Sequence, residues 1–375
     1  MLSSLGIKNY RNLKYLNINS LKRVNLITGK NNTGKSTLLE AIAMYATKGD
    51  ISFIHQLLED RGESIKQRTK DVNSAEDNIK MLSSLFNNRK IGFDIIDAIS
   101  IGNLNNDFLG ENTLSKDSIS LRFVNYIEEI FTDEQGNKTT RKRIFRNGLR
   151  NPFDDYVGFE IITEYYSNIV TLEVDLSYRF RNKWFTNVAN IQFIRIQNIK
   201  NDNNGKLFDK IALTEKEKYV IEALKIIEPL TERIAFVEEA PGERSAVVKL
   251  SDSKQKFPLQ NMGDGMNRIL TVILALVNAE NGYLLIDEFE NGLHHSVQEK
   301  LWTIIFELSR KLNIQIFVTT HSNDCIKGFV SVLNDATNST DGKLIRLDNK
   351  NGMIKQVEFD AKELKIATDR DIEIR

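Results

Sequence analysis

The sequence has few of the residues on which extracellular, metal-rich or membrane-embedded folds depend. One cysteine, Cys325, and four histidines occur among 375 residues, which excludes an internal disulfide and a cysteine- or histidine-rich metal cluster. Four prolines and no Gly/Ser-rich tract are present, so composition marks no linker. The longest apolar run, residues 269–277, is about half of the ~20 residues that a membrane span needs. No signal peptide is recognisable at the N-terminus, and we therefore expect a cytoplasmic protein without membrane contact.

An excess of charge of either sign is also missing. The 51 Lys and Arg residues balance 51 Asp and Glu residues, for a formal net charge of +0, which excludes a global basic coat for nucleic acid. A local patch remains a candidate, in two basic segments: Arg141, Lys142 and Arg143, and Arg179, Arg181 and Lys183. The second segment alternates with aromatic residues, so its cations share one face of an expected strand. These cations fit a solvated sheet face, a DNA or RNA surface, or a site for an acidic protein.

Hydrophobic periodicity predicts an α/β protein. Residues 2–18 alternate as a β-hairpin does, and residues 119–190 are typical of antiparallel strands. After residue 260 the pattern becomes helix, strand, helix, strand, which indicates a parallel sheet covered on both faces. Residues 50–118 indicate helices and polar loops.

We accordingly expect one unit over residues 1–375 without internal repeats. Its core lobes would be residues 1–48 and 119–375, and residues 50–118 would form a mostly helical insertion. This division depends on pattern alone, because no linker separates the segments.

The clearest motif is a phosphate-binding loop. Residues 29–36, Gly-Lys-Asn-Asn-Thr-Gly-Lys-Ser, match G-x-x-x-x-G-K-[ST] at every fixed position, between an expected strand and an expected helix. The glycines let backbone N–H groups cradle phosphates, Lys35 places a charge on the β- and γ-phosphates, and Ser36 offers a hydroxyl to Mg²⁺. The expected ATP-binding residues are Gly29, Asn31, Asn32, Thr33, Gly34, Lys35, Ser36 and Thr37.

Two later strands end in residues suited to phosphate chemistry. The apolar run 283–286 is followed by Asp287, placed to hold Mg²⁺, and by Glu288, placed to polarise the attacking water. The next apolar strand ends near His321, which we expect at the same edge of the sheet, within reach of a γ-phosphate. With Lys35, the catalytic candidates are Glu288 and His321.

A second glycine turn precedes an apolar helix. It contains Asn261, Gly263, Asp264 and Gly265, and a helix N-terminus of this kind binds anions as the first loop does. Since one nucleotide does not need two such loops in one chain, the second loop is expected to serve a nucleotide held by another subunit. The loop that contains Asn291 and Gly292 is placed to touch that facing subunit.

Taken together, these strings resemble an ABC-type ATPase head of the kind found in structural-maintenance-of-chromosomes (SMC) and RecF-like proteins. The resemblance is greatest to the ATPases grouped with the overcoming-lysogenization-defect (OLD) nucleases. It rests on residues 261–268, 285–295 and 319–326, and on the opening string 7–13. The specific similarity covers residues 1–48 and about 205–330.

The resemblance implies a mixed sheet core with an antiparallel β subdomain, and ATP and Mg²⁺ as cofactors. Lys35 and Ser36 would be Walker A residues, Asp287 the Walker B aspartate, Glu288 the catalytic glutamate and His321 the switch histidine. Residues 261–265 would be the signature loop, with Asn261 at a position where a serine is usual and Asp264 between the glycines. Gln197, slightly ahead of Gln192, would be the glutamine-loop ligand of the metal.

The resemblance also implies partners. Two ATP molecules would be held in a head-to-tail homodimer, or in a higher even-numbered oligomer. About 45 residues follow the histidine strand and its helix, too few for a fused Toprim nuclease, so a separate effector, Toprim-like nuclease or toxin, is implied in bacterial anti-phage defence. The alternatives are a RecF-like DNA repair or recombination ATPase that clamps DNA without an effector, and a scaffold that barely turns over ATP.

Overall fold

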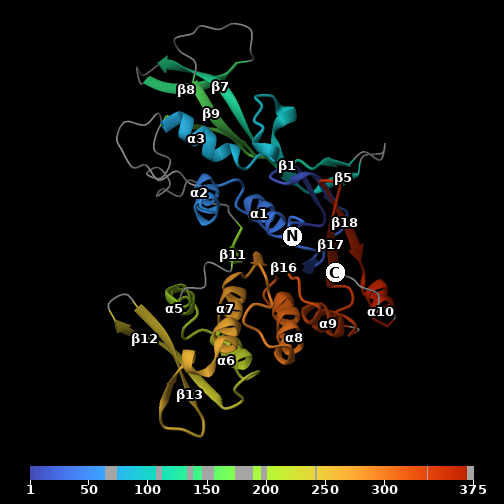
Figure 1. The fold of residues 1–375 in the computed structure, drawn as a ribbon. Coiled ribbons are helices and arrows are strands. Elements are labelled where there is room, and N and C mark those ends of the chain that lie inside the picture. The colour runs from blue at the N-terminus through green and yellow to red at the C-terminus, as the bar shows by residue number, and fades with distance from the viewer. Residues whose placement is uncertain are drawn as a thin grey trace.

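The protein is a mixed α/β molecule, seen here in a computed structural model (Figure 1). The structure describes residues 1–63, 74–106, 112–132, 138–145, 156–173, 189–195, 201–240, 243–335 and 337–369. None of the helices in these ranges is long and apolar enough to cross a membrane. The α/β class and the P-loop core expected from the sequence are confirmed.

A six-stranded sheet forms the centre, in the order β11–β15–β16–β3–β17–β18. The first five strands run parallel, and β18 runs antiparallel to β17. Their bounds are β3 Val24–Thr28, β11 Ile191–Ile194, β15 Tyr283–Ile286, β16 Gln315–Thr319, β17 Gly342–Lys350 and β18 Met353–Phe359. Five carboxyl ends therefore meet at one edge, which is where ligands bind in open α/β sheets.

Alternate side chains of the central strands enter two different cores. In β15, Leu284 and Ile286 belong to the core between the sheet and helices α7, α8 and α9. Tyr283 and Leu285 belong to the second core, which contains α1 and the amino-terminal strands. Because successive side chains of a strand point to opposite faces, a wholly apolar strand is stable only between two covering layers, as the sequence pattern predicted.

Helices cover both faces of this sheet. Figure 1 shows α7, α8 and α9 side by side beneath it, with α1 on the opposite side. The helix bounds are α1 Lys35–Ala46, α2 Ile51–Asp60, α3 Ser74–Ser83, α5 Asn201–Asp209, α6 Glu217–Leu224, α7 Asp264–Asn278, α8 His295–Lys311, α9 Asn323–Leu333 and α10 Ala361–Asp369.

A seven-stranded antiparallel sheet packs over α1, in the order β10–β9–β7–β4–β1–β2 with β8 paired to β7. Its bounds are β1 Leu5–Tyr10, β2 Leu13–Ile18, β4 Ile99–Gly102, β7 Ile119–Thr132, β8 Lys138–Ile144, β9 Tyr156–Ile162 and β10 Ser167–Thr171. The expected amino-terminal hairpin and the antiparallel strands after residue 119 are confirmed over the described residues.

The prediction of a mostly helical insertion at residues 50–118 is wrong for its second half, where strands β4, β5 and β6 lie between residues 99 and 114. Helices α2 and α3 lie in the first half, but β4 pairs with both β1 and β7 in the middle of the antiparallel sheet. Two further short strands, β5 Leu104–Asn106 and β6 Asn112–Leu114, pair with each other. Ile99 and Ile101 are the buried side chains of β4, and an alternation over so few residues is too short to identify a strand by itself.

Along the chain, a small three-stranded sheet lies between α6 and α7. The periodicity of the sequence did not indicate it. It consists of β12 Thr231–Ala240, β13 Glu243–Leu250 and β14 Lys256–Pro258. Val248 and Ile234 bury its inner face in the core that contains α7. Figure 1 shows β12 and β13 projecting from the body of the molecule.

Candidate functional site

The loop between β3 and α1 has the backbone conformation that a phosphate cradle needs. Gly29 has φ 142° and Gly34, the residue that precedes α1, has φ 87°. A Cβ atom at Gly29 would lie 2.4 Å from the carbonyl oxygen of Leu347. Glycine is therefore required at this position by both torsion and space, and the residues present fit a triphosphate.

Lys35 folds back over the same loop. Its Nζ donates to the carbonyl oxygens of Gly29 at 2.7 Å and of Lys30 at 3.0 Å, and the hydroxyl of Thr33 donates to the carbonyl of Lys30 at 2.8 Å. The first turn of α1, which includes Ser36 and Thr37, contains no acidic residue. No carboxylate of the helix's own first turn thus competes for the positive end of the helix dipole.

The turn between β1 and β2 lies against this loop. The side-chain amide of Asn12 is 3.2 Å, through Nδ2, from the position of a Cβ at Gly34. Arg11 holds the turn, since it forms ion pairs with the buried Glu40 of α1 and with Glu63. The sequence predicted the hairpin over residues 2–18 but contained no sign that its turn borders the phosphate loop.

The acidic pair lies at the end of β15, next to the end of β16. The hydroxyl of Thr319 donates to Oδ1 of Asp287 at 2.5 Å and accepts the backbone N–H of Glu288 at 2.9 Å. Strand β3, which leads into the phosphate loop, pairs with the other side of β16. The structure therefore brings Asp287, Glu288 and Lys35 to one edge of the sheet, as expected from the sequence. Thr319 was missed.

His321 lies at the same edge and is held by a glutamate. Its backbone N–H donates to Oε1 of Glu290 at 2.8 Å, and its ring Nδ1 lies 2.9 Å from the same oxygen. The hydroxyl of Thr320 donates to Oε2 of Glu290 at 2.8 Å. The imidazole is 48% exposed and therefore lies at the surface of this edge. Glu290 is a further residue that the sequence did not single out.

Glu288 has a conformation unusual for a glutamate. Its φ is 50°, in the left-handed region that residues with a Cβ adopt rarely. The side-chain amide of Asn291 donates to its Oε2 at 2.9 Å. In a single chain, the loop expected to face another subunit therefore contacts the candidate catalytic glutamate directly.

The second glycine turn, Gly263–Gly265, lies beside that loop. A Cβ at Gly265 would be 3.5 Å from the carbonyl oxygen of Gly292, whereas no atom lies within 4 Å of a Cβ at Gly263. Gly263 has φ 93°, and Asn261, Gly263 and Asp264 are exposed. Next to the turn is a hollow of about 440 Å³, with Met262, Ile227 and Val297 among its walls. The two elements expected to act on a facing subunit thus form one surface.

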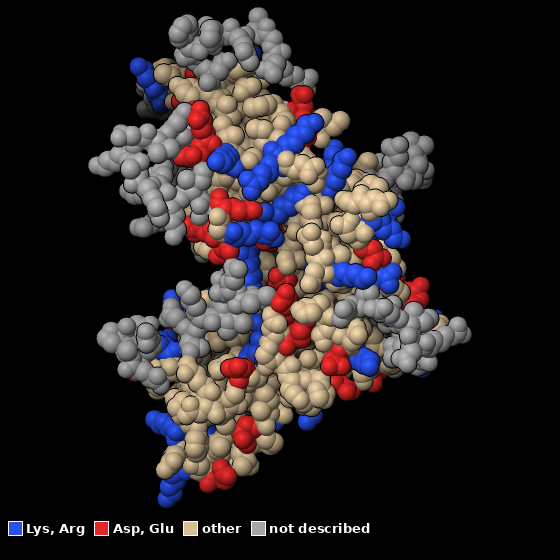
Figure 2. All heavy atoms as spheres, in the orientation of Figure 1, with Lys and Arg blue, Asp and Glu red and all other residues tan. Residues whose placement is uncertain are grey.

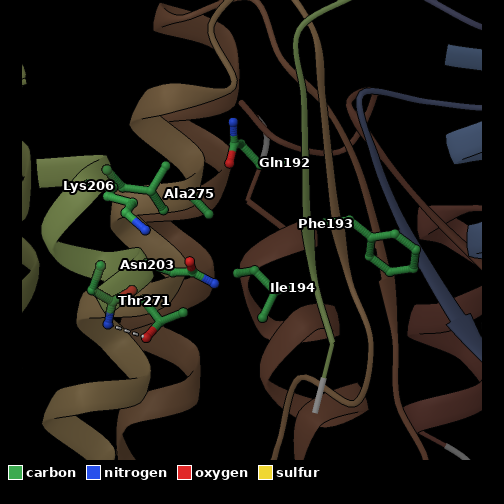
Figure 3. A pocket seen from close by; sticks show the side chains of 9 residues that line it. Gln192, Phe193, Ile194, Asn203, Lys206, Thr271 and Ala275 are labelled. Carbon is green, nitrogen blue, oxygen red and sulfur yellow. Dashed lines mark hydrogen bonds between the residues drawn. The ribbon is translucent and has the colours of Figure 1, made fainter. Parts of the chain in front are cut away.

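The glutamine of the metal site is not placed by the structure, because Gln197 lies outside the described residues. Gln192, the other candidate, lies within β11 rather than after it. Figure 3 shows Gln192 and Ile194 directed toward α5 and α7, and Phe193 directed to the other side of the strand. Gln192 lines a cavity of about 260 Å³ together with Asn203 and Thr271.

The structure describes the first of the two basic segments but not the second. Lys142 donates to Oγ1 of Thr171 and to the carbonyl of Ile169, and Arg143 forms an ion pair with Glu129. The guanidinium of Arg141 lies 4.9 Å from the ring centre of Phe131. Arg179, Arg181 and Lys183 fall outside the described residues. Figure 2 shows Lys and Arg side chains gathered across the middle of one face, with acidic side chains dispersed around them.

Comparison with known proteins gives a family. The profile of the family described as "AAA domain, putative AbiEii toxin, Type IV TA system" matches residues 24–324, a range that contains the phosphate loop, the second glycine turn, the acidic pair and His321. This range is most of the chain.

Individual relatives are more distant. An "ATP/GTP phosphatase" of Helicobacter pylori is 26% identical over 355 residues, which cover 87% of each protein. A "Retron Vc95 probable ATPase" of Vibrio cholerae is 23% identical and covers 86% of this chain and 70% of that protein. Among solved structures, an SMC head bound to the C-winged helix domain of ScpA has a TM-score of 0.47 at 13% identity, over 96% of this chain and 97% of that chain.

Proposed function

The chain belongs to the family described as "AAA domain, putative AbiEii toxin, Type IV TA system", and on this premise we propose that it is an ATPase whose sites form between two copies of the chain. It hydrolyses ATP to ADP and phosphate. The observation that carries the proposal is the clamp by Thr319, which holds Asp287 and the backbone of Glu288 beside the strand that leads into the phosphate loop.

The phosphate loop binds the substrate. When ATP is bound, Lys35 exchanges its bonds to the carbonyls of Gly29 and Lys30 for phosphate oxygens. This exchange does not leave the half-buried ammonium unpaired, because it has oxygen partners in both states. The N–H groups around Gly34 and the hydroxyls of Ser36 and Thr37 complete the cradle.

Mg²⁺ fits the oxygen donors at this edge, since Ser36 and Asp287 offer a hydroxyl and a carboxylate and Mg²⁺ takes oxygen ligands. When bound, the ion neutralises charge on the β- and γ-phosphates. The hydrogen bond from Thr319 fixes which oxygen of Asp287 stays available. Gln197 remains the proposed third ligand.

Glu288 activates the attacking water. A general base must reach the proton that it takes, so the carboxylate has to leave Asn291, whose amide now holds it. Movement of the loop at Asn291–Gly292 against a second subunit would release it. His321, oriented through Glu290, then contacts the γ-phosphate.

The second subunit supplies the second glycine turn. Gly263 is exposed with open space around its α-carbon. Its backbone N–H donates to the carbonyl of Gln260 at 3.4 Å, so the N–H groups offered to an anion are those at the start of α7, which follows directly. In a head-to-tail dimer, each turn would meet the γ-phosphate held by the other chain. A closed two-fold arrangement buries both nucleotides at once.

The finer biological role follows the OLD-like resemblance and the AbiEii-related family. We infer a cytoplasmic ATPase that regulates a separate effector, a Toprim-like nuclease or a toxin, in anti-phage defence. The RecF-like alternative has less support, because Lys142 and Arg143 are both engaged within the protein.

The test is co-purification of the chain with the product of its neighbouring gene, followed by mass measurement with and without ATP. An ATP-dependent complex containing an even number of ATPase chains and a nuclease- or toxin-like protein supports the proposal. An ATPase dimer that binds DNA and no protein partner would support the RecF-like function instead.

A further inference from the structure

Helix α7 carries an arginine that contacts the catalytic edge from below. Arg268 is 3% exposed and lies three residues after Gly265, in the first turns of the helix. Its Nη2 donates to the backbone carbonyl of Glu288 at 2.9 Å and lies 3.4 Å from that of Asp287. One side chain thus connects the helix of the second glycine turn to the backbone of the acidic pair.

The rest of this guanidinium is buried without hydrogen bonds. Among the described residues, neither Nε nor Nη1 of Arg268 has a partner, and each exposes less than 1 Å². Burial lowers the pKa of Arg268, while the carboxylates of Glu290, Asp287 and Glu288 act to raise it. A buried cation that leaves two donors unused is costly for stability, so its presence is not explained by packing.

The contact falls on the strained residue of the site. Glu288 has φ 50°, and such a conformation persists only when its surroundings over-determine it. Its N–H is held by Thr319 and its carbonyl by Arg268, at 2.9 Å each. The two bonds bracket the residue and thereby set the direction in which its side chain leaves the backbone.

Arg268 also touches the loop beyond Glu288. A Cβ at Gly292 would lie 3.7 Å from the Cβ of Arg268, and Gly292 in turn lies next to Gly265. A displacement of the amino-terminal turn of α7 would therefore reach the acidic pair through the buried side chain of Arg268 and its planar guanidinium.

We propose that Arg268 is a positioning residue, which aims the carboxylate of Glu288 through its backbone carbonyl and makes hydrolysis depend on the position of α7. This inference rests on the proposed function, since it assigns to Glu288 the activation of water. It goes further in linking the two sites of a dimer. Arg268 connects two elements. One is the second glycine turn, which binds the partner's nucleotide, and the other is Glu288, which acts on the nucleotide of its own chain.

The experiment compares steady-state ATP hydrolysis and ATP binding for Arg268→Met and Arg268→Lys. We expect kcat to fall about 100-fold in Arg268→Met, as for other losses of alignment, with KM and the Kd for ATP within about 3-fold of the wild type. Arg268→Lys keeps the charge and one donor, and should recover part of kcat. Arg233→Met, at a side chain that is 78% exposed, is the matched control and should retain full activity.

A double-mutant cycle separates positioning from general damage. If Arg268 acts through Glu288, adding Arg268→Met to Glu288→Gln should lower the remaining turnover by less than about 3-fold. The inference is overturned if folded Arg268→Met keeps its kcat, or if it loses the same factor in both backgrounds. Should Arg268→Met fail to fold, the same two comparisons are made with Arg268→Lys.

Failure of the proposed function gives a different result. A wild type that hydrolyses no ATP overturns both ideas. A wild type inactivated by Lys35→Ala, alongside fully active Arg268 variants, overturns the role of Arg268 alone.

Discussion

The hydroxyl of Thr319 donates a 2.5 Å hydrogen bond to Oδ1 of Asp287, across the boundary between two adjacent parallel strands. The hydroxyl oxygen of Thr319 in turn accepts the N–H of Glu288 at 2.9 Å. A single hydroxyl therefore fixes both the proposed metal ligand and the backbone of the proposed base. Since it lies between the strand of the acidic pair and the strand that leads to the phosphate loop, it sets their relative geometry.

Replacement of Thr319 by valine tests this clamp. Valine has nearly the same shape but no hydroxyl, so Asp287 loses a donor and the N–H of Glu288 loses its acceptor. We expect kcat to fall by about 10- to 100-fold, as for other residues that orient metal ligands. Thr319→Ser keeps the hydroxyl and should stay near the wild-type rate, and equal activity of the valine and serine variants would contradict the clamp. Steady-state hydrolysis at saturating ATP and Mg²⁺ is the measurement.

Lys35→Ala should abolish ATP binding. The loop contains two lysines, Lys30 and Lys35. The ammonium of Lys35, which now bonds to the carbonyls of Gly29 and Lys30, is the one proposed to meet the phosphates. Lys30→Ala, which removes an exposed side chain from the same loop, is the matched control. Binding of a fluorescent ATP analogue measures both variants. Retained binding in Lys35→Ala, or equal loss in the two, is incompatible with the proposed cradle.

Glu288→Gln should keep ATP binding and lose turnover. The amide has the size of the carboxylate but cannot accept a proton, so we expect kcat to fall by about 10²- to 10⁴-fold while the Kd for ATP stays unchanged. The ATP-bound dimer should then persist long enough to be seen by size-exclusion chromatography with light scattering. Slow turnover that is the same in wild type and variant would instead favour a scaffold that binds ATP without using it.

A contact on the back of α1 predicts how stability depends on pH. The hydroxyl of Tyr45 donates to Oδ2 of Asp117 at 2.6 Å. Burial acts to raise the pKa of Asp117, but hydrogen bonds from Ser115, Tyr45 and Asn103 hold it below its ordinary value of 3.8. A lowered carboxyl pKa stabilises the folded state above pH 3.8, and this contribution disappears as the pH falls through the folded-state pKa.

Tyr45→Phe should therefore lower the free energy of unfolding by about 1.5–3 kcal/mol at pH 7, the range for a hydrogen bond to a charged group. The difference from the wild type should shrink as the pH is lowered below 3.8. Urea denaturation at several pH values measures it. A difference that is constant across this range would show that the phenol hydroxyl does not act through the Asp117 carboxylate.

The sequence predicted those parts of the fold that have a strong local pattern. The apolar run that becomes β15 was placed at its actual bounds, Tyr283–Ile286, because both faces of that strand are buried. Helix α7, expected after residue 260, begins at Asp264, because the second glycine turn runs directly into the helix. Strand β4 was missed because its partners, β1 and β7, lie at other places along the chain.

The same distinction applies to the site. Lys35, Asp287, Glu288 and His321 belong to motifs, and the structure places them along one edge as expected. Thr319, Glu290 and Arg268 lie within the strings that carry the family resemblance, but those strings assign them no role. Threonine, glutamate and arginine are common residue types, and what sets these three apart is contact between the end of β16, the loop after β15 and helix α7. Contacts of that kind become visible only when the strands are placed side by side.

The central claim is that each ATP is gripped by Lys35 of one chain and the second glycine turn of the other. Mixing two inactive variants tests it most directly. Lys35→Ala breaks the phosphate loop. Gly263→Glu strains the turn, because φ at Gly263 is 93°, and places a negative side chain where it would repel a γ-phosphate. A mixed dimer of the two contains one site with both elements intact. We predict that neither variant alone hydrolyses ATP and that their mixture recovers a substantial fraction of the wild-type rate. A mixture as inactive as its components, although both variants are folded and form mixed dimers, would contradict the shared site.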